Sequence, residues 1–442
     1  MSKIFFFIIV ISLFNSCSFD NKTGIWNDET KSKTKIADKN KKLENVFPQN
    51  DMFNKEKKPH FEKRGFLDKV KINQNWSEKF LSQNNKLTNF AFNNEFNIKL
   101  LSKKINSRIE PEILLENQNM ILHDRNGTIF VYSINEKDEI FRFNFYDKKT
   151  KKNSLKLIKF ISNNFIYVAD NLGYLYCLDI NKKKLVWAKN YNIPFFSNLK
   201  LKNQILFLVN ENNNLIAINA KNGEKAGNFF TDKSLFQTNY VNSLALQEDN
   251  LYLLNSNGNL YSLKMPNFQL NWIKNFKPAG ANKTSNLFYA HPLTVFDNKI
   301  VISTKSTLNV IDSQNSSLLW SANIDSRFKP IISGNLIFLV TTKDYLICLN
   351  SENGKIHWSK NYKKILLNES IKFKNIGEII DIKIIENKIF LTTKKSKIIQ
   401  IDPISSEIIS IKDLNYRIFN KPIIANNKIY YLDTKKRLVE IN

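Results

Sequence analysis

The sequence contains few of the residues from which metal sites and nucleophilic sites are usually built. Its 442 residues include only three cysteines and four histidines. The histidines are far apart and lack the short spacing of zinc ligands. No phosphate-binding loop, nucleophile elbow or zinc-protease helix is present. These absences argue against a catalytic residue, a metal site and a bound cofactor.

Cysteine pairing is also not indicated. Cys177 and Cys348 stand at the same register of two different repeats, where Val or Ala stands in other repeats. We therefore interpret both as small core residues, with a disulfide as the alternative. No two cysteines are adjacent in the sequence, so an adjacent-cysteine disulfide is excluded.

Acidic residues are in the minority, and the formal net charge is +26. The basic residues are spread along the chain and often lie in turns, as in Lys182–Lys184. The sequence shows neither a basic helix nor a nucleic-acid motif. We therefore expect solvated charge and no nucleic-acid binding, with attraction to anionic lipid or an acidic partner left open.

The N-terminus has the pattern of an export signal. An early lysine precedes an unbroken apolar run from Ile4 to Ile11, which is too short to span a bilayer. Ser16 and Cys17 follow where the apolar stretch ends. This pattern resembles a bacterial lipoprotein signal peptide over residues 1–16, with lipidation at Cys17. The alternative is an ordinary secretory signal with an incidental cysteine.

Residues 17–75 show no sustained hydrophobic period and are rich in Lys, Asn, Asp and Glu. Such a segment buries too little apolar surface to offset its ordering entropy. We predict a lipidated, disordered and flexible tether here. The alternative is a segment whose scattered aromatic residues anchor it to a partner.

The rest of the chain is repetitive. A four-residue register begins with Leu or Ile, ends with a large apolar residue and usually has a small third residue. Its copies begin at Ile129, Leu175, Leu215, Leu260, Leu308, Leu346, Ile398 and Leu438. A second apolar run precedes each copy and a polar turn follows it, with Asn-Gly in several repeats.

A further strand follows each polar turn except the last. It carries Trp187, Trp272, Trp320 or Trp358, with Phe141, Gly227 and Ser410 at the equivalent positions, 38 to 52 residues apart. Strand-only repeats of this length are typical of propeller blades. We predict an all-β, eight-bladed β-propeller of four-stranded blades over residues 76–442. The divergent Gly227 repeat and the long interval before Ser410 leave a count of seven open.

The last copy ends at Asn442 without its Trp-bearing strand. Trp76 lies on a spare segment ahead of the first repeat. We expect this N-terminal strand to complete the last blade and close the ring, because closure removes exposed sheet edges. Trp76, Trp187, Trp272, Trp320 and Trp358 are then the structural anchors of the repeats.

The combination of hairpin, Asn-Gly-Lys turn and Trp is similar to the pyrroloquinoline-quinone-type propeller repeat. Its clearest copies are residues 175–187 and 346–358. With the lipoprotein signal and the closing strand, the chain resembles the BamB family, the lipoproteins of the outer-membrane protein assembly machinery. The resemblance implies a non-catalytic scaffold, lipid-anchored to the outer membrane and facing the periplasm. Implied partners are the periplasmic domains of the barrel-forming assembly protein and unfolded outer-membrane protein clients.

The family's contact loops correspond here to residues 193–198 and 287–292, but they lack the family's Arg and acidic pair. The candidates for partner binding in these loops are Phe195, Phe196, Phe288 and Tyr289, with packing under the blades as the alternative. A second function class stays open, because the same repeat occurs in quinoprotein dehydrogenases. The alternative is therefore a periplasmic quinoprotein-like or glycan-acting propeller enzyme.

Overall fold

The computed structural model describes residues 51–62, 64–106, 108–147, 155–233, 241–277, 288–362, 364 and 376–442. It also describes two short paired strands, β1 (Ser18–Phe19) and β2 (Trp26–Asn27). The chain divides into two compact units, Met1–Met52 and Phe53–Asn442. A short 3₁₀ helix, η1 (Asp51–Asn54), lies at their boundary.

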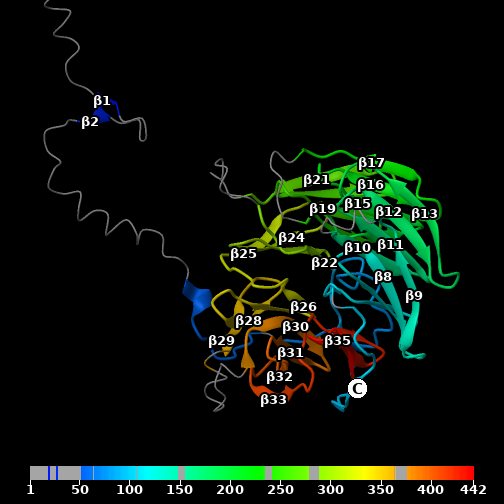
Figure 1. The fold of residues 1–442 in the computed structure, drawn as a ribbon. Coiled ribbons are helices and arrows are strands. Elements are labelled where there is room, and N and C mark those ends of the chain that lie inside the picture. Colours follow the sequence, from blue (N-terminus) through cyan, green and yellow to red (C-terminus); the bar gives the residue numbers. More distant parts are fainter. Residues whose placement is uncertain are drawn as a thin grey trace, which may run out of the picture. The chain divides into compact units, whose positions relative to one another are not determined.

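The second unit is built from antiparallel sheets that follow one another along the chain (Figure 1). The first three sheets contain β6 (Leu114–Glu116), β7 (Asn119–His123), β8 (Thr128–Ser133) and β9 (Asp138–Asn144); β10 (Leu157–Ser162), β11 (Phe165–Asp170), β12 (Tyr174–Asp179) and β13 (Lys184–Asn190); and β14 (Lys200–Lys202), β15 (Ile205–Val209), β16 (Leu215–Asn219) and β17 (Lys225–Phe229). The next three contain β18 (Ser243–Gln247), β19 (Asn250–Leu254), β20 (Asn259–Lys264) and β21 (Gln269–Asn275); β22 (Thr294–Phe296), β23 (Lys299–Ser303), β24 (Leu308–Asp312) and β25 (Leu318–Ala322); and β26 (Ile331–Ser333), β27 (Leu336–Val340), β28 (Tyr345–Asn350) and β29 (Ile356–Asn361).

The last two sheets take in strands from the N-terminal side of the repeats. One contains β30 (Ile379–Ile385), β31 (Lys388–Thr393), β32 (Lys397–Ile401) and β33 (Ile408–Asp413), and it is extended by β4 (Asn89–Phe90) and β3 (Val70–Lys71) in parallel pairing. The other contains β34 (Ile423–Ala425), β35 (Lys428–Leu432), β36 (Leu438–Ile441) and β5 (Ile98–Leu100).

The propeller of four-stranded blades is therefore confirmed, but the predicted eight four-stranded blades are wrong. Within Phe53–Asn442, the described residues form seven four-stranded sheets and one six-stranded sheet. The difference arises because β4 and β3 pair with the open edge of β30, which the repeat pattern does not encode.

The identity of the closing strand also differs from the prediction. An N-terminal strand does complete the last sheet, but it is β5, whose Ile98 and Leu100 pair with Ile441 and Val439. Trp76 instead bridges Leu115 in β6 and stacks on Phe90, with ring centroids 5.8 Å apart. The closing strand thus lies about twenty residues later in the sequence, without a tryptophan to mark it.

In seven of the eight sheets, all except the one closed by β5, the outer strand has a β-bulge opposite the same register position. In β12 and β13, Cys177 pairs with Trp187 and the register shifts immediately afterwards. Cys348 and Trp358 repeat this arrangement in β28 and β29. A bulge bends the strand and re-aims its side chain. The third register position is small because it lies directly opposite the large outer residue, and both cysteines are free and buried there.

The tryptophans join neighbouring blades. Each indole Nε1–H donates to a backbone carbonyl of the next repeat, at Ala220, Ser313, Ser351 and Pro403, over 2.8–3.2 Å. In two of the four cases a turn glycine of that repeat packs against the ring, Gly223 against Trp187 and Gly354 against Trp320: a Cβ on Gly354 would lie 2.6 Å from Trp320, and φ there is +70°. Glycine is required on both counts. This contact explains the Asn-Gly turns at Gly223 and Gly354, whereas Ser316 and Ser406 take the corresponding positive-φ position in the repeats that follow Trp272 and Trp358.

The predicted tether is wrong for residues 53–75, which pack on the blades. Phe53 is buried in the core between β22–β25 and β26–β29. Lys57 forms an antiparallel bridge with Ser359 in β29, and the ring of Phe61 stacks on His357 at 4.2 Å. The scattered aromatic side chains supply enough contact area to order a segment that has no periodicity. Residues 17–50 lie outside the described residues, apart from β1 and β2.

Candidate functional site

The centre of the propeller is occupied by the protein's own chain. The first strands of neighbouring sheets approach one another, β6 with β10, β14 with β18, β18 with β22 and β26 with β30, so these strands form the inner ring. Residues 73–93, here called the axial strap, run along this ring and contact the sheets in chain order. Figure 1 shows the strap in blue among the blades.

Backbone and side-chain hydrogen bonds fix the strap to the inner ring. Their partners, in order around the ring, are Trp76 with Leu115, Ser77 with Ile161, Gln83 with Leu201 and Leu246, Asn84 with Val295, and Asn85 with Lys329. Beyond these, Asn89 pairs with Ile384, and the Asn93 N–H donates to the Asn427 carbonyl. The strap therefore links sheets that are otherwise distant in sequence.

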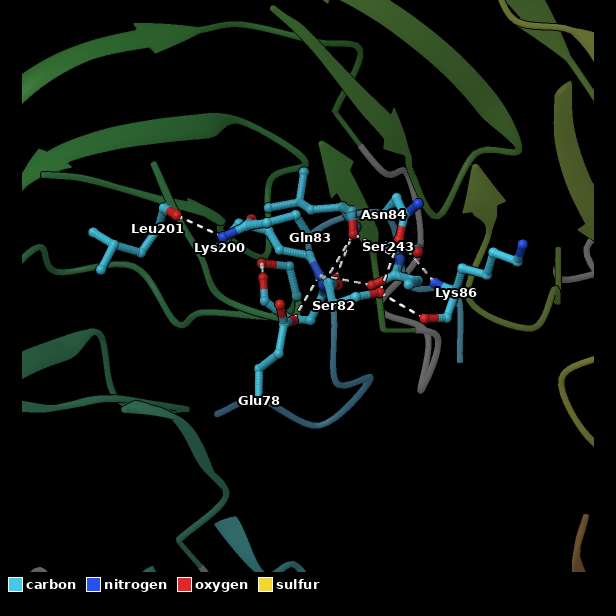
Figure 2. Close-up of polar contacts among 12 residues, drawn as sticks. Glu78, Ser82, Gln83, Asn84, Lys86, Lys200, Leu201 and Ser243 are labelled. Carbon is cyan, nitrogen blue, oxygen red and sulfur yellow. Dashed lines mark hydrogen bonds and ion pairs between the residues drawn. The ribbon is translucent and has the colours of Figure 1, made fainter. Parts of the chain in front are cut away.

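A buried ion pair holds the middle of the strap (Figure 2). The Lys200 ammonium donates to Glu78 Oε2 at 2.6 Å, and to the Ser82 carbonyl and Asn85 Oδ1 at 2.7 Å each. Asn85 in turn donates to the Leu244 and Leu293 carbonyls at 2.9 Å each. All three ammonium protons have acceptors, as a buried cation requires.

Burial acts on both members of this pair. It raises the pKa of Glu78 and lowers the pKa of Lys200, and the mutual attraction opposes each change. Side-chain exposure is 4% for Glu78 and 0% for Lys200. Losing one partner would leave the other charge buried and unpaired.

Lysines recur on the inner ring beside the strap. We call Lys159, Lys200, Lys329, Lys383 and Lys421 the axial lysines. They lie in or directly before β10, β14, β26, β30 and β34, respectively. Three have an acidic neighbour: Glu78 for Lys200, Asp381 for Lys383, and Glu112 for Lys159 at 3.8 Å. Among the described residues, Lys329 and Lys421 form no ion pair.

A cavity opens between the strap and four of the sheets. This axial pocket has a volume of about 360 Å³. Its charged lining consists of Lys79, Glu112, Lys329, Asp381, Lys383 and Lys421. Its apolar lining includes Trp76, Phe80, Leu87, Phe328, Ile382 and Ile423. Four lysines and two acids therefore share a cavity with a largely hydrophobic wall.

Burial and mutual repulsion lower the pKa of two of these lysines, Lys329 and Lys421. Burial, with a contribution from Lys200, lowers the pKa of Lys329 to about 7. The pKa of Lys421 is lowered by burial and by the charges of Lys383 and Lys79, although Asp381 opposes this. The pocket therefore carries more positive than negative charge.

The sequence-predicted partner-binding aromatics divide into two kinds. Phe195 and Phe288 are buried in inter-blade cores, with exposures of 2% and 7%, which is the alternative of packing under the blades that the sequence left open. Tyr289 is 49% exposed, and Phe196 is half-buried beside a smaller cavity of about 210 Å³. In each loop the first aromatic residue, Phe195 or Phe288, is buried, and the aromatic residue that follows it is more exposed. Cys17 lies outside the described residues.

Neither the strap nor the axial pocket was found from the sequence. Residues 81–86 read as an irregular polar segment, and their partners lie more than a hundred residues away. One signal was available: Lys329-Pro330-Ile331-Ile332 and Lys421-Pro422-Ile423-Ile424 open two repeats identically. This shared start places both lysines at the same position of the inner ring.

The described part of the chain contains neither a metal-binding cluster nor a membrane-spanning helix. No group of three or more His, Cys, Asp or Glu side chains is positioned there to hold a metal ion. No described helix has the length and hydrophobicity needed to cross a membrane.

The fold and its repeats define a β-propeller of the pyrroloquinoline-quinone repeat type. The family described as "Outer membrane protein assembly factor BamB" matches residues 125–360, which is more than half of the chain. The chain belongs to this family. A BamB of Moranella endobia (strain PCIT) is 34% identical over 71 residues, a match that spans 16% of this chain and 18% of that protein's length.

Solved structures show the same fold at low identity. BamB from Moraxella catarrhalis superposes with a TM-score of 0.58 at 12% identity, covering 77% of this chain and 99% of that one. A quinohemoprotein alcohol dehydrogenase from Pseudomonas putida HK5 gives a TM-score of 0.59 at 10% identity, covering 83% and 79%. These likenesses establish the propeller fold but do not distinguish a scaffold from an enzyme.

Proposed function

We propose that this chain is a non-catalytic scaffold of the outer-membrane protein assembly machinery. Its family membership supports an assembly role. The observation that carries the non-catalytic part is the axial strap, which fills the centre of the ring with hydrogen-bonded backbone and a buried ion pair. A quinoprotein-like or glycan-acting site at the axis would have to displace these contacts.

The proposed anchor is a lipid attached to Cys17, with residues 1–16 removed as a signal peptide. Residues 17–52 would then connect the lipid to the propeller, which begins at Phe53. This arrangement holds the protein at the outer membrane on its periplasmic side. Inhibition of signal peptidase II should leave an unprocessed precursor, and normal maturation would contradict lipidation.

The proposed partners are the periplasmic domains of the barrel-forming assembly protein and its unfolded outer-membrane clients. Within the predicted contact loops, Tyr289 is the exposed aromatic side chain and Phe196 is partly accessible. Exposed aromatic residues are common anchors at protein interfaces. These two residues are therefore the remaining candidates for partner contact.

Affinity purification from mildly solubilised membranes tests the assignment. The lipidated wild-type protein should recover the barrel-forming assembly protein, and the Tyr289→Ala/Phe196→Ala double variant should recover less of it. Ile273→Ala is a suitable control, because Ile273 is another exposed apolar residue, at 47%, outside both loops and outside the cavity beside Phe196. Absence of every barrel-assembly component from the wild-type eluate would refute the scaffold role.

A further inference from the structure

One junction between blades differs from the others at the rim. We call the junction between the last sheet (β34–β36 with β5) and the first (β6–β9) the closing seam. Four other junctions contain a tryptophan from the outer strand of the preceding sheet. A fifth contains Phe141 of β9, which is buried at the equivalent position. The outer strands β17 and β33 carry only Gly227 and Ser410 there.

Phenylalanines from the following sheet fill the two junctions that have a small outer residue. Phe268, in the turn after β20, lies 3.1 Å from the place where a Cβ on Gly227 would stand. Phe96, which precedes β5, stacks on Phe390 of β31 at 6.4 Å, and the Lys412 ammonium of β33 lies over its ring. Close packing thus requires a large side chain at each junction, from one sheet or from the other.

The closing seam has an aromatic residue at neither position. Opposite the third register residue, Glu440, the outer strand β5 carries Lys99. The turn of the first sheet carries Lys137, with φ +56°, at the position that Phe268 takes in its own repeat. A groove of about 860 Å³ opens at this junction. We attribute the groove to the missing aromatic side chain.

The groove can accept an indole ring. Leu100 is 40% exposed in it, and Tyr132 lines it with its hydroxyl donating to the Leu101 carbonyl at 2.6 Å. Each rim tryptophan donates to the carbonyl five residues after the start of the register copy in the next repeat. In the first sheet this carbonyl belongs to Ile134, and no tryptophan of the described residues donates to it.

The charged lining of the groove is mainly basic. It consists of Lys103, Lys104, Lys137, Asp138, Glu139, Arg142 and Arg437. Arg142 is paired with Glu139, and Arg437 is paired with Asp433 outside the groove lining. Within the described part of the chain, three exposed bases of the lining form no ion pair: Lys103, Lys104 and Lys137. These lysines favour an acidic ligand.

We propose that the groove at the closing seam binds an acidic peptide segment of a partner protein through a tryptophan. The indole takes the place that a rim tryptophan takes at other junctions, against Leu100 and Tyr132 and within reach of the Ile134 carbonyl. The acidic residues beside it pair with Lys103 and Lys104. This surface is separate from the loops of Phe196 and Tyr289, and the proposal does not rest on the scaffold role.

Fluorescence anisotropy with the full chain in mild detergent tests the proposal. The probe is a fluorescein-labelled, amidated peptide of sequence Glu-Asp-Trp-Asp-Glu. We expect saturable binding with a Kd below about 1 mM. The peptides Glu-Asp-Ala-Asp-Glu and Lys-Lys-Trp-Lys-Lys should each bind at least about tenfold more weakly, because each lacks one of the two matched features.

Charge reversal locates the binding. Lys103→Glu/Lys104→Glu should weaken the binding of the acidic tryptophan peptide at least about tenfold. Both residues are exposed, so the fold should be retained, which circular dichroism would verify. The matched control is Lys182→Glu/Lys183→Glu, which makes the same change of charge on exposed lysines of the second sheet, outside the groove. This control should bind the peptide with nearly the wild-type affinity.

Filling the junction tests the place of the indole. Lys99→Trp, in a chain whose circular dichroism is unchanged, should weaken peptide binding about tenfold, because its own ring would occupy the groove.

Four results would overturn the proposal. They are the absence of saturable binding to the wild-type chain, equal affinities for the tryptophan and alanine peptides, equal affinities of the two charge-reversal variants, and an unchanged affinity in the folded Lys99→Trp variant. None of these measurements uses a barrel-assembly component, so their outcome is separate from the test of the scaffold role.

Discussion

The outer rim and the centre of this propeller join the blades in different ways. At the rim, one contact is repeated: a tryptophan donates to a carbonyl of the next repeat and, in two of the four cases, covers its turn glycine. At the centre, a single strap makes a different contact with each sheet. Rim contacts are apolar with one hydrogen bond, whereas the strap depends on a buried ion pair. The rim contact is therefore present in several copies, whereas each contact of the strap occurs only once.

The largest expected effect is at the centre. Glu78→Gln leaves the Lys200 ammonium buried without a counter-charge, which should cost roughly 3–5 kcal/mol of unfolding free energy. Urea denaturation measures this cost. The double variant Glu78→Leu/Lys200→Met removes both charges and should be clearly more stable than Glu78→Gln. A loss below about 1 kcal/mol for Glu78→Gln would contradict the importance of the pair.

A smaller effect is expected where the rim contact requires glycine. Gly354→Ala forces a Cβ against the Trp320 ring at a positive φ, which should cost roughly 1–3 kcal/mol. In a Trp320→Ala background, the share of this cost that comes from the clash with the ring disappears, and only the share that comes from the positive φ should remain. Thermal denaturation of the four variants measures the coupling. An unchanged cost in that background would show that the tryptophan does not press on the turn.

The tryptophans should differ in how much each contributes to the free energy of unfolding, because they differ in burial. Trp358 is fully buried and donates to the Pro403 carbonyl at 2.8 Å, whereas Trp272 is partly exposed and its bond is 3.2 Å. Trp358→Phe should therefore be more destabilising than Trp272→Phe by about 1 kcal/mol, since the buried carbonyl is left unpaired. Equal losses of unfolding free energy would show that burial does not set the strength of this contact.

The smallest effect is a pH dependence from the pocket. The folded-state pKa of Lys329, about 7, is below its unfolded value, so the unfolded chain binds more protons between pH 7 and the usual lysine range. Stability should therefore rise with pH over this interval, and less so in Lys329→Met. The neighbouring titratable groups are Lys79, Glu112, Lys200, His291, Asp381, Lys383 and Lys421. Identical slopes in the two proteins would contradict this assignment.

The sequence predicted the features that repeat. The small residue opposite the tryptophan and the Asn-Gly turn recur because each blade packs against its neighbours in the same way. Their period can therefore be read from a single sequence. Cys177 and Cys348 were placed correctly for this reason. The closing strand was assigned to Trp76 because a tryptophan marked the other outer strands, but β5 has none.

Features that occur once could not be predicted in the same way. Asn85 and Glu78 are polar residues in an irregular segment, and their role depends on Lys200, more than a hundred residues later. Residues 53–75 appeared too polar to fold, yet Phe53 and Phe61 are placed by surfaces formed by β22–β29. Long-range contacts of this kind have no local pattern.

Hydrogen exchange of residues 73–93 in the intact protein tests the central claim most directly. If the strap is part of the folded ring, its amides, including those of Trp76 and Asn85, should be protected about as strongly as those of β10 and β30. Exchange of the strap as fast as that of exposed turns, while the inner strands stay protected, would show that the centre of the propeller is not held by the strap.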